Sequence, residues 1–160
     1  MLLEQWQHNE PVSLFVSDGE TEQEYRLWFK TMSAFDASKF QTKQRRARLV
    51  IEELYGTPDD RTPEQQEDAE AMSQVLYYHA AIFAALGKVE LNSEDGWQAA
   101  RLPESWYDAK TAAHEMPAEV INDLFVATIE AGNSARTFGI LPSTDGEKKA
   151  LRLTVQPSKN

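Results

Sequence analysis

The sequence predicts an α+β fold in which an N-terminal β-hairpin packs on a mainly helical body of three to four helices. Two observations carry this prediction. Residues 12–16 and 24–30 alternate between apolar and polar side chains, as half-buried strands do. Later segments repeat apolar residues at helical spacing and are separated by Gly and Pro. A chain of 160 residues is the size of one domain.

We expect the domain to span residues 1–133. Residues 134–160 are rich in Ser, Thr, Gly and Pro, which predicts a partly flexible C-terminal tail. Within this tail, Leu151 to Val155 has the pattern of an edge strand.

The hairpin is predicted from its two strands and from Asp18-Gly19, a turn pair in the link between them. Trp28 and Phe29 are neighbours on the second strand, so their side chains point to opposite faces. One of them therefore faces the core, and the other does not.

Two long helices should follow. Ser33 or Asp36 can cap the first, whose apolar residues repeat until Tyr55-Gly56. Thr62 and Gln65 have capping-box spacing, which predicts a second helix from Pro63 to Leu86. Its second half is apolar almost all round, so this helix should be central and about 35 Å long.

The distal half predicts a short strand over residues 88–91 that ends at a turn containing Gly96. A weak helix should follow over residues 108–114. Pro117 suits the first turn of a last helix, which Gly132-Asn133 would end. The apolar positions of this last helix are Val120, Ile121, Leu124, Phe125 and Thr128.

The net charge of −10 is concentrated in the middle third of the chain. Residues 51–100 contain eleven acidic and two basic side chains. This excess disfavours contacts with nucleic-acid phosphates, because such contacts need Lys and Arg. It suits a solvated surface that keeps the protein soluble, or a basic partner.

A basic cluster lies on the first long helix, and its members are Lys39, Lys43, Arg45, Arg46 and Arg48. We expect a solvated face or pairing with the acidic middle third. The chain has no Cys, no apolar run of about 20 residues and no secretion-signal pattern, so we expect a cytoplasmic protein that does not enter a membrane.

No pattern predicts catalysis, a cofactor or a metal site. His79 lies in the apolar helix without a second His or a carboxylate three or four residues away, so it should be a core histidine. The acidic pairs Asp59-Asp60 and Glu94-Asp95 fall in turns without a neighbouring nucleophile. We therefore expect a protein that is not an enzyme and acts by binding.

Five aromatic residues are the candidates for partner binding: Trp97, Trp106, Tyr107, Tyr77 and Tyr78. The first three lie in loop-rich sequence, where a large aromatic side chain either fills the edge of the core or marks a docking surface. Tyr77 and Tyr78 are about 100° apart on their helix, so both cannot enter the same layer.

The order of several features resembles the small tail assembly chaperones of long-tailed bacteriophages. The resemblance spans about residues 10 to 133 and rests on apolar spacings and turn residues. In the distal half these residues are Leu86-Gly87, Val89, Asp95-Gly96, Leu102-Pro103, Met116-Pro117, Leu124 and Asn133; in the first half they are residues 11–16, 24–30 and 33–36.

This resemblance implies a protein that holds the tape measure protein soluble and recruits tail tube subunits during tail assembly. It would act in the cytoplasm of the host cell and be absent from the mature virion. The family is often made in two lengths by a ribosomal frameshift, and this sequence would be the shorter form. Self-association is a further expectation.

Three alternatives stay open. The protein is a small acidic chaperone of another system, such as those for secreted effectors, if it forms a dimer through strands. It is an acidic inhibitor that mimics DNA if its carboxylates form a phosphate-like array. It is an enzyme of another type if a pocket gathers several titratable groups.

Overall fold

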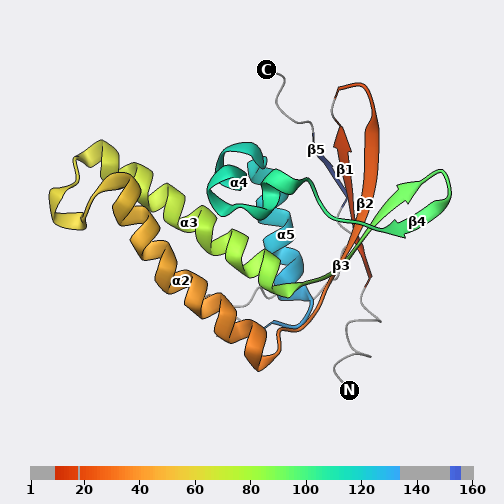
Figure 1. The fold of residues 1–160 in the computed structure, drawn as a ribbon, viewed down its shortest axis with the longest axis horizontal. Helices are drawn as coiled ribbons and strands as arrows, with labels where there is room; N and C mark the ends of the chain where they lie inside the picture. The colour runs from red at the N-terminus through yellow and green to blue at the C-terminus, as the bar shows by residue number, and fades with distance from the viewer. Residues whose placement is uncertain (1–9, 18, 134–151, 156–160) are drawn as a thin grey trace.

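The computed structural model describes residues 10–17, 19–133 and 152–155, and it shows the predicted α+β fold. Five described strands form one sheet in the order β4-β3-β2-β1-β5. Neighbouring strands are antiparallel except β1 and β5, which are parallel. The strands are β1 (Val12–Ser17), β2 (Glu22–Phe29), β3 (Leu86–Ser93), β4 (Gly96–Ala99) and β5 (Arg152–Val155). The helices lie together on one side of this sheet (Figure 1).

The predicted hairpin is confirmed in its strands and in its apolar face. Val12 pairs with Leu27 and Leu14 with Tyr25, and the alternate residues of both strands are buried. Phe29 is 3% exposed, whereas its neighbour Trp28 lies on the other face and is half-buried.

The sheet continues beyond the hairpin, because the chain returns after α3 to add β3 and β4. Placing Trp97 in a loop was wrong. Gly96 has φ +98° and closes a tight turn, after which Trp97 pairs with Asn92 of β3. A turn of this kind joins two antiparallel strands. The turn that was predicted to end a single strand therefore connects β3 to β4 in a second hairpin.

The two long helices, α2 (Ala34–Tyr55) and α3 (Pro63–Ala85), form an antiparallel pair that extends away from the sheet (Figure 1). Both predicted N-termini are confirmed by capping boxes. Ser33 caps α2 with Asp36, and Thr62 caps α3 with Gln65. A 3-10 turn, η1 (Pro58–Asp60), lies at the tip of the pair, where much of the acidic excess is exposed.

The main core lies between the inner face of the sheet and the helices. Leu14 and Leu27 are fully buried against the end of α3, where Ile82 is also fully buried, and against α5 (Ala118–Glu130). A second, smaller core joins α2 to α3 through Ile51, Met72 and other apolar residues. The predicted central position of α3 follows from its place in both cores.

The distal elements are η2 (Glu104–Tyr107), α4 (Ala109–Glu115) and α5. Pro117 is the residue that precedes α5, and all five predicted apolar positions of α5 are buried. Gly132 has φ +98° and Asn133 is 5% exposed, so the predicted end of this helix is confirmed.

The predicted edge strand corresponds to β5, the last strand in the sheet order. The predicted flexibility of the tail concerns residues 134–151 and 156–160, which lie outside the described residues, so it stays a prediction.

Candidate protein-binding surface

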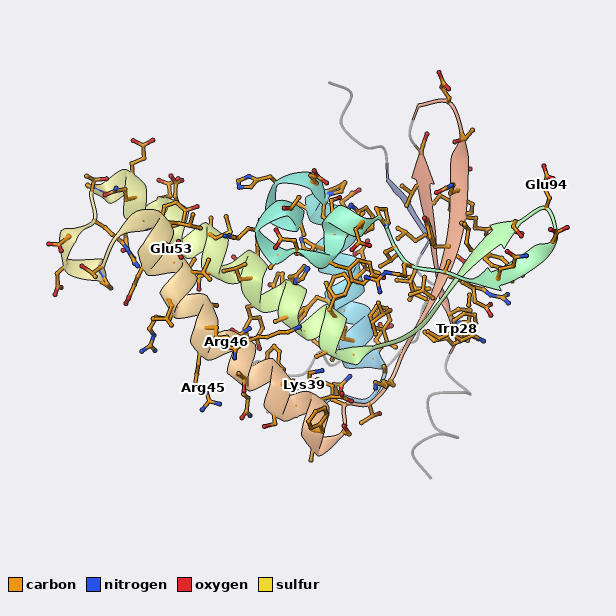
Figure 2. The ribbon with its side chains drawn as sticks, in the orientation of Figure 1. Trp28, Lys39, Arg45, Arg46, Glu53 and Glu94 are labelled. Atoms are coloured by element: carbon orange, nitrogen blue, oxygen red, sulfur yellow. The ribbon has the colours of Figure 1, made fainter. Side chains whose placement is uncertain are left out.

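The outer face of the sheet carries a group of aromatic and charged side chains that we call the outer sheet patch. Alternation along β2 places Tyr25, Leu27 and Phe29 in the core, so the residues between them point to the opposite face. Trp28 lies on the side of the sheet away from the described helices (Figure 2). The patch consists of Glu24, Arg26, Trp28, Lys88, Glu90, Asn92 and Trp97.

Arg26 is at the centre of the patch. Its guanidinium carbon lies 4.1 Å from the ring centre of Trp97 and 5.0 Å from that of Trp28. Its Nε and Nη2 atoms both donate to Oε1 of Glu90 at 2.7 Å. The two indoles and the carboxylate therefore hold one guanidinium from three sides.

Lys88 extends this arrangement along β3. Its ammonium lies 4.8 Å from the ring centre of Trp28 and 3.1 Å from Oε2 of Glu90. The carboxylate of Glu90 thus receives a separate cation on each oxygen. Hydrogen bonds from Arg26 and then from Lys88 lower the pKa of Glu90 below its usual range, so the carboxylate stays ionised down to acidic pH.

The patch is a preorganised, amphipathic surface. The indoles supply apolar area, and their positions are fixed by cations that are themselves paired with a carboxylate. Trp and Arg are the residue types that contribute most to protein–protein binding, because they combine a large contact area with directed hydrogen bonds. The arrangement therefore presents apolar area beside charges whose positions are fixed.

Of the five aromatic residues predicted for partner binding, Trp97 alone belongs to the patch. Trp106 is 4% exposed and lies in the main core. Of the two alternatives for this residue, core filling rather than a docking surface is therefore the one observed. Tyr107 is half-buried against Phe83, with ring centres 5.0 Å apart, and its hydroxyl accepts the N–H of Leu102 at 3.0 Å.

Tyr77 and Tyr78 also pack inside the fold, and both contact Phe125 of α5. The ring of Tyr78 stacks on Phe125 at 4.4 Å, and Tyr77 meets it at 5.9 Å. Tyr77 also contacts Phe40 of α2. Both tyrosines therefore connect α3 to α5, and Tyr77 also connects α3 to α2.

Sequence reasoning missed Arg26, Trp28, Lys88 and Glu90 as members of a site. The available signal was the alternation of β2, which predicts that Arg26 and Trp28 share a face. The contribution of β3 and β4 had no local signal, because it depends on which strands pair and in which register.

His79 is a core histidine, as predicted. It is 5% exposed, and its Nε2 lies 2.7 Å from the carbonyl oxygen of Trp106. Since a carbonyl only accepts, Nε2 carries the proton. Burial lowers the pKa of His79, which favours the neutral ring.

A cleft of about 760 Å³ lies between α2 and α3, and Gln44, Arg48, Ile51 and Tyr77 are among its lining residues. Burial, and then the neighbouring Tyr78, raise the pKa of Tyr77 to about 12, so its phenol is neutral. The cleft combines apolar side chains with the titratable groups of Arg48, Glu52, Arg61, Glu70 and Tyr77, and Ser73 also lines it.

The described part of the chain contains no group of three or more His, Asp or Glu side chains that could hold a metal ion. Among the described helices, none combines the length and the apolar character that crossing a bilayer requires.

The fold and the patch together define an α+β protein in which helices cover one face of the sheet and no described helix covers the other, aromatic face. No family model, curated protein or solved structure matches this chain.

Proposed function

We propose that this protein acts by binding another protein through the outer sheet patch. The observation that carries the proposal is the position of Arg26 between Trp28 and Trp97, on a sheet face that no described helix covers. Holding these three side chains in place before binding reduces the conformational entropy that a partner would have to overcome.

In its finer form, the proposal is a tail assembly chaperone of a long-tailed bacteriophage. The partner would be the tape measure protein, around which tail tube subunits are then recruited in the host cytoplasm. The support is the resemblance over about residues 10 to 133. Three of its residues are structurally important: Gly96 in the turn, Leu102 in the core and Asn133 after α5.

The patch suits such a chaperone for a physical reason. A long helical protein awaiting assembly exposes apolar side chains, and the half-exposed indoles of Trp28 and Trp97 can cover them. The net charge of −10 would keep the resulting complex soluble.

The test is co-expression with the tape measure protein encoded in the same genome, followed by affinity capture of this chain. We expect the tape measure protein to become soluble and to co-purify at a defined ratio. The double variant Trp28→Ala, Trp97→Ala should capture at least about tenfold less, as loss of two interface aromatics predicts.

The matched control is Val126→Ala, which removes an apolar side chain that is 43% exposed on α5, away from the patch. Circular dichroism and thermal melting establish that each variant is folded. If the tape measure protein stays insoluble beside the well-folded wild type, the chaperone assignment is wrong. If it is captured equally by the double variant, the patch is not the binding surface.

A further inference from the structure

The outward face of α2 carries two large apolar side chains that no described element covers. Phe35 is 71% exposed and Leu49 is 65% exposed. They are two heptads apart, which places them on the same side of the helix at about 21 Å. We call this face the α2 stripe; its members are Phe35, Lys39, Thr42, Arg45, Arg46 and Leu49.

The inner side of α2 explains why these residues are exposed. Phe40 and Ile51 are buried against α3, and Gln44 lies between them on the same side. The side of α2 that carries these residues therefore packs on α3, and the α2 stripe lies on the opposite side. Arg45 points away from α3 on the open side of the helix (Figure 2).

The cations of the stripe are available for a partner. Lys39, Arg45 and Arg46 form no ion pair with a described residue. Lys39 lies 5.3 Å from the ring centre of Phe35, and Arg45 donates a hydrogen bond to the hydroxyl of Thr42 at 3.4 Å. The predicted pairing of these cations with the acidic middle third is thus not found among the described residues. The alternative, a solvated face, is found instead.

From this combination we propose that the α2 stripe docks an acidic amphipathic helix of a partner protein. Phe35 and Leu49 would pack against apolar side chains two heptads apart, as the seam of a coiled coil does. Asp and Glu flanking that seam would pair with Lys39, Arg45 and Arg46. This surface is separate from the outer sheet patch, so the proposal does not depend on the proposed function.

Charge disfavours the other occupants. Antiparallel packing of two α2 stripes, with Phe35 of one copy opposite Leu49 of the other, would centre the contact on Thr42 and place Arg45 opposite Lys39, where like charges repel. Nucleic acid and anionic membranes extend beyond the stripe, so they would also meet Glu52 and Glu53, which follow Leu49 after two residues, and the rest of a protein with a net charge of −10. The same net charge opposes an acidic helix, but a helix no longer than the stripe contacts mainly Lys39, Arg45 and Arg46.

The experiment measures binding of the whole chain to a fluorescent synthetic helix of about 21 residues, by anisotropy. Its apolar seam carries Leu at heptad spacing, and Glu flanks the seam. A second peptide has the same seam with every Glu replaced by Lys. We expect the acidic peptide to bind and to weaken with salt, and the basic peptide to bind at least about tenfold more weakly.

Two variants locate the site. Arg45→Glu with Arg46→Glu, and separately Phe35→Ala with Leu49→Ala, should each weaken binding of the acidic peptide at least about tenfold. All four side chains are exposed, so the fold should tolerate both pairs. Lys110→Glu is the matched control, because it reverses an exposed charge on α4, outside the stripe.

Several outcomes would overturn the proposal. Equal binding of the two peptides would show that the stripe does not select an acidic partner. An effect of Lys110→Glu as large as that of the stripe variants would show that the peptide does not bind at the stripe. Tighter binding to a DNA oligonucleotide or to phosphatidylglycerol vesicles would assign the stripe to another ligand. Sedimentation showing a dimer that Phe35→Ala with Leu49→Ala dissociates would make a second copy the occupant.

Discussion

The side-chain oxygen of Asn133 accepts a hydrogen bond from the backbone N–H of Met32 at 2.7 Å, although the two residues are 101 positions apart. The amide nitrogen of Asn133 donates to the carbonyl oxygens of Lys30 at 3.0 Å and Thr128 at 2.7 Å. One buried amide thus joins the end of α5 to the segment between β2 and α2.

Replacing Asn133 by Ala should lower the free energy of unfolding by about 3 kcal/mol, because three backbone groups lose their partner in a buried position. Asn133→Asp should be similarly harmful, since a carboxylate can accept from Met32 but cannot donate to the two carbonyls. Urea unfolding measures both. Asn122→Ala, at an exposed position of α5, is the control and should change stability by less than about 0.5 kcal/mol.

The glycine before Asn133 should be harder to replace than the glycine of the β3–β4 turn. Gly96 and Gly132 both have φ +98°, so an alanine is strained by about 1–2 kcal/mol at either position. At Gly132 the new methyl group would also lie 2.9 Å from Oγ1 of Thr31, whereas at Gly96 nothing lies within 4 Å.

We therefore expect a lower melting temperature for Gly132→Ala than for Gly96→Ala. Thr31→Ala in the Gly132→Ala background should recover part of the difference, although it also removes the hydrogen bond from Thr31 to the carbonyl oxygen of Ala131. Equal melting temperatures of the two single variants would show that the backbone absorbs the close contact.

Features that depend on neighbouring residues could be predicted from the sequence. Thr62 is predictable as a cap because its partner Gln65 lies three residues away. For α2 the sequence offers Ser33 or Asp36, and the structure gives Ser33 as the cap with Asp36 as its partner. The buried faces of the first hairpin and of α5 follow from spacing alone. For the same reason, the apolar surroundings of His79 in its own helix were enough to predict a core histidine.

The candidate site could not be predicted in the same way, because its contacts join distant segments. Arg26 meets Glu90 across 64 residues, and Trp97 reaches Arg26 through a strand pairing that local pattern does not specify. Trp106 shows the opposite case: its neighbours are loop-like, yet tertiary packing buries it. Exposure of an aromatic residue is a property of the whole fold.

Stability should fall as the pH drops below about 6.5, the ordinary pKa of histidine, because burial depresses the pKa of His79. The unfolded chain then takes up a proton before the folded chain does, which favours unfolding until the lower, folded pKa is passed. Lys43 opposes the charged ring, whereas the Trp106 carbonyl and Asp108 favour it.

Thermal melting between pH 7.5 and pH 5 tests this prediction. His79→Gln should flatten the dependence in that range, and the control Asn122→Ala, at an exposed position of α5 that does not titrate, should leave it unchanged. The pKa values of Asp36, Glu90 and Asp108 are depressed, so the stability that their carboxylates contribute is lost at lower pH. A wild-type melting temperature that is constant from pH 7 to pH 5 would contradict the prediction.

The contact between Arg26 and Trp97 should be measurable as a coupling free energy. Their 4.1 Å separation predicts about 0.5–1 kcal/mol at a partly exposed site. Urea unfolding of Arg26→Ala, Trp97→Ala and the double variant gives this value as the departure from additivity. Arg26→Lys should keep a positive charge but lose most of the coupling, because an ammonium cannot stack on the indole while donating twice to Glu90. Additive single-variant effects would mean that the two side chains lie together without stabilising each other, and the patch would then not be preorganised by this pair.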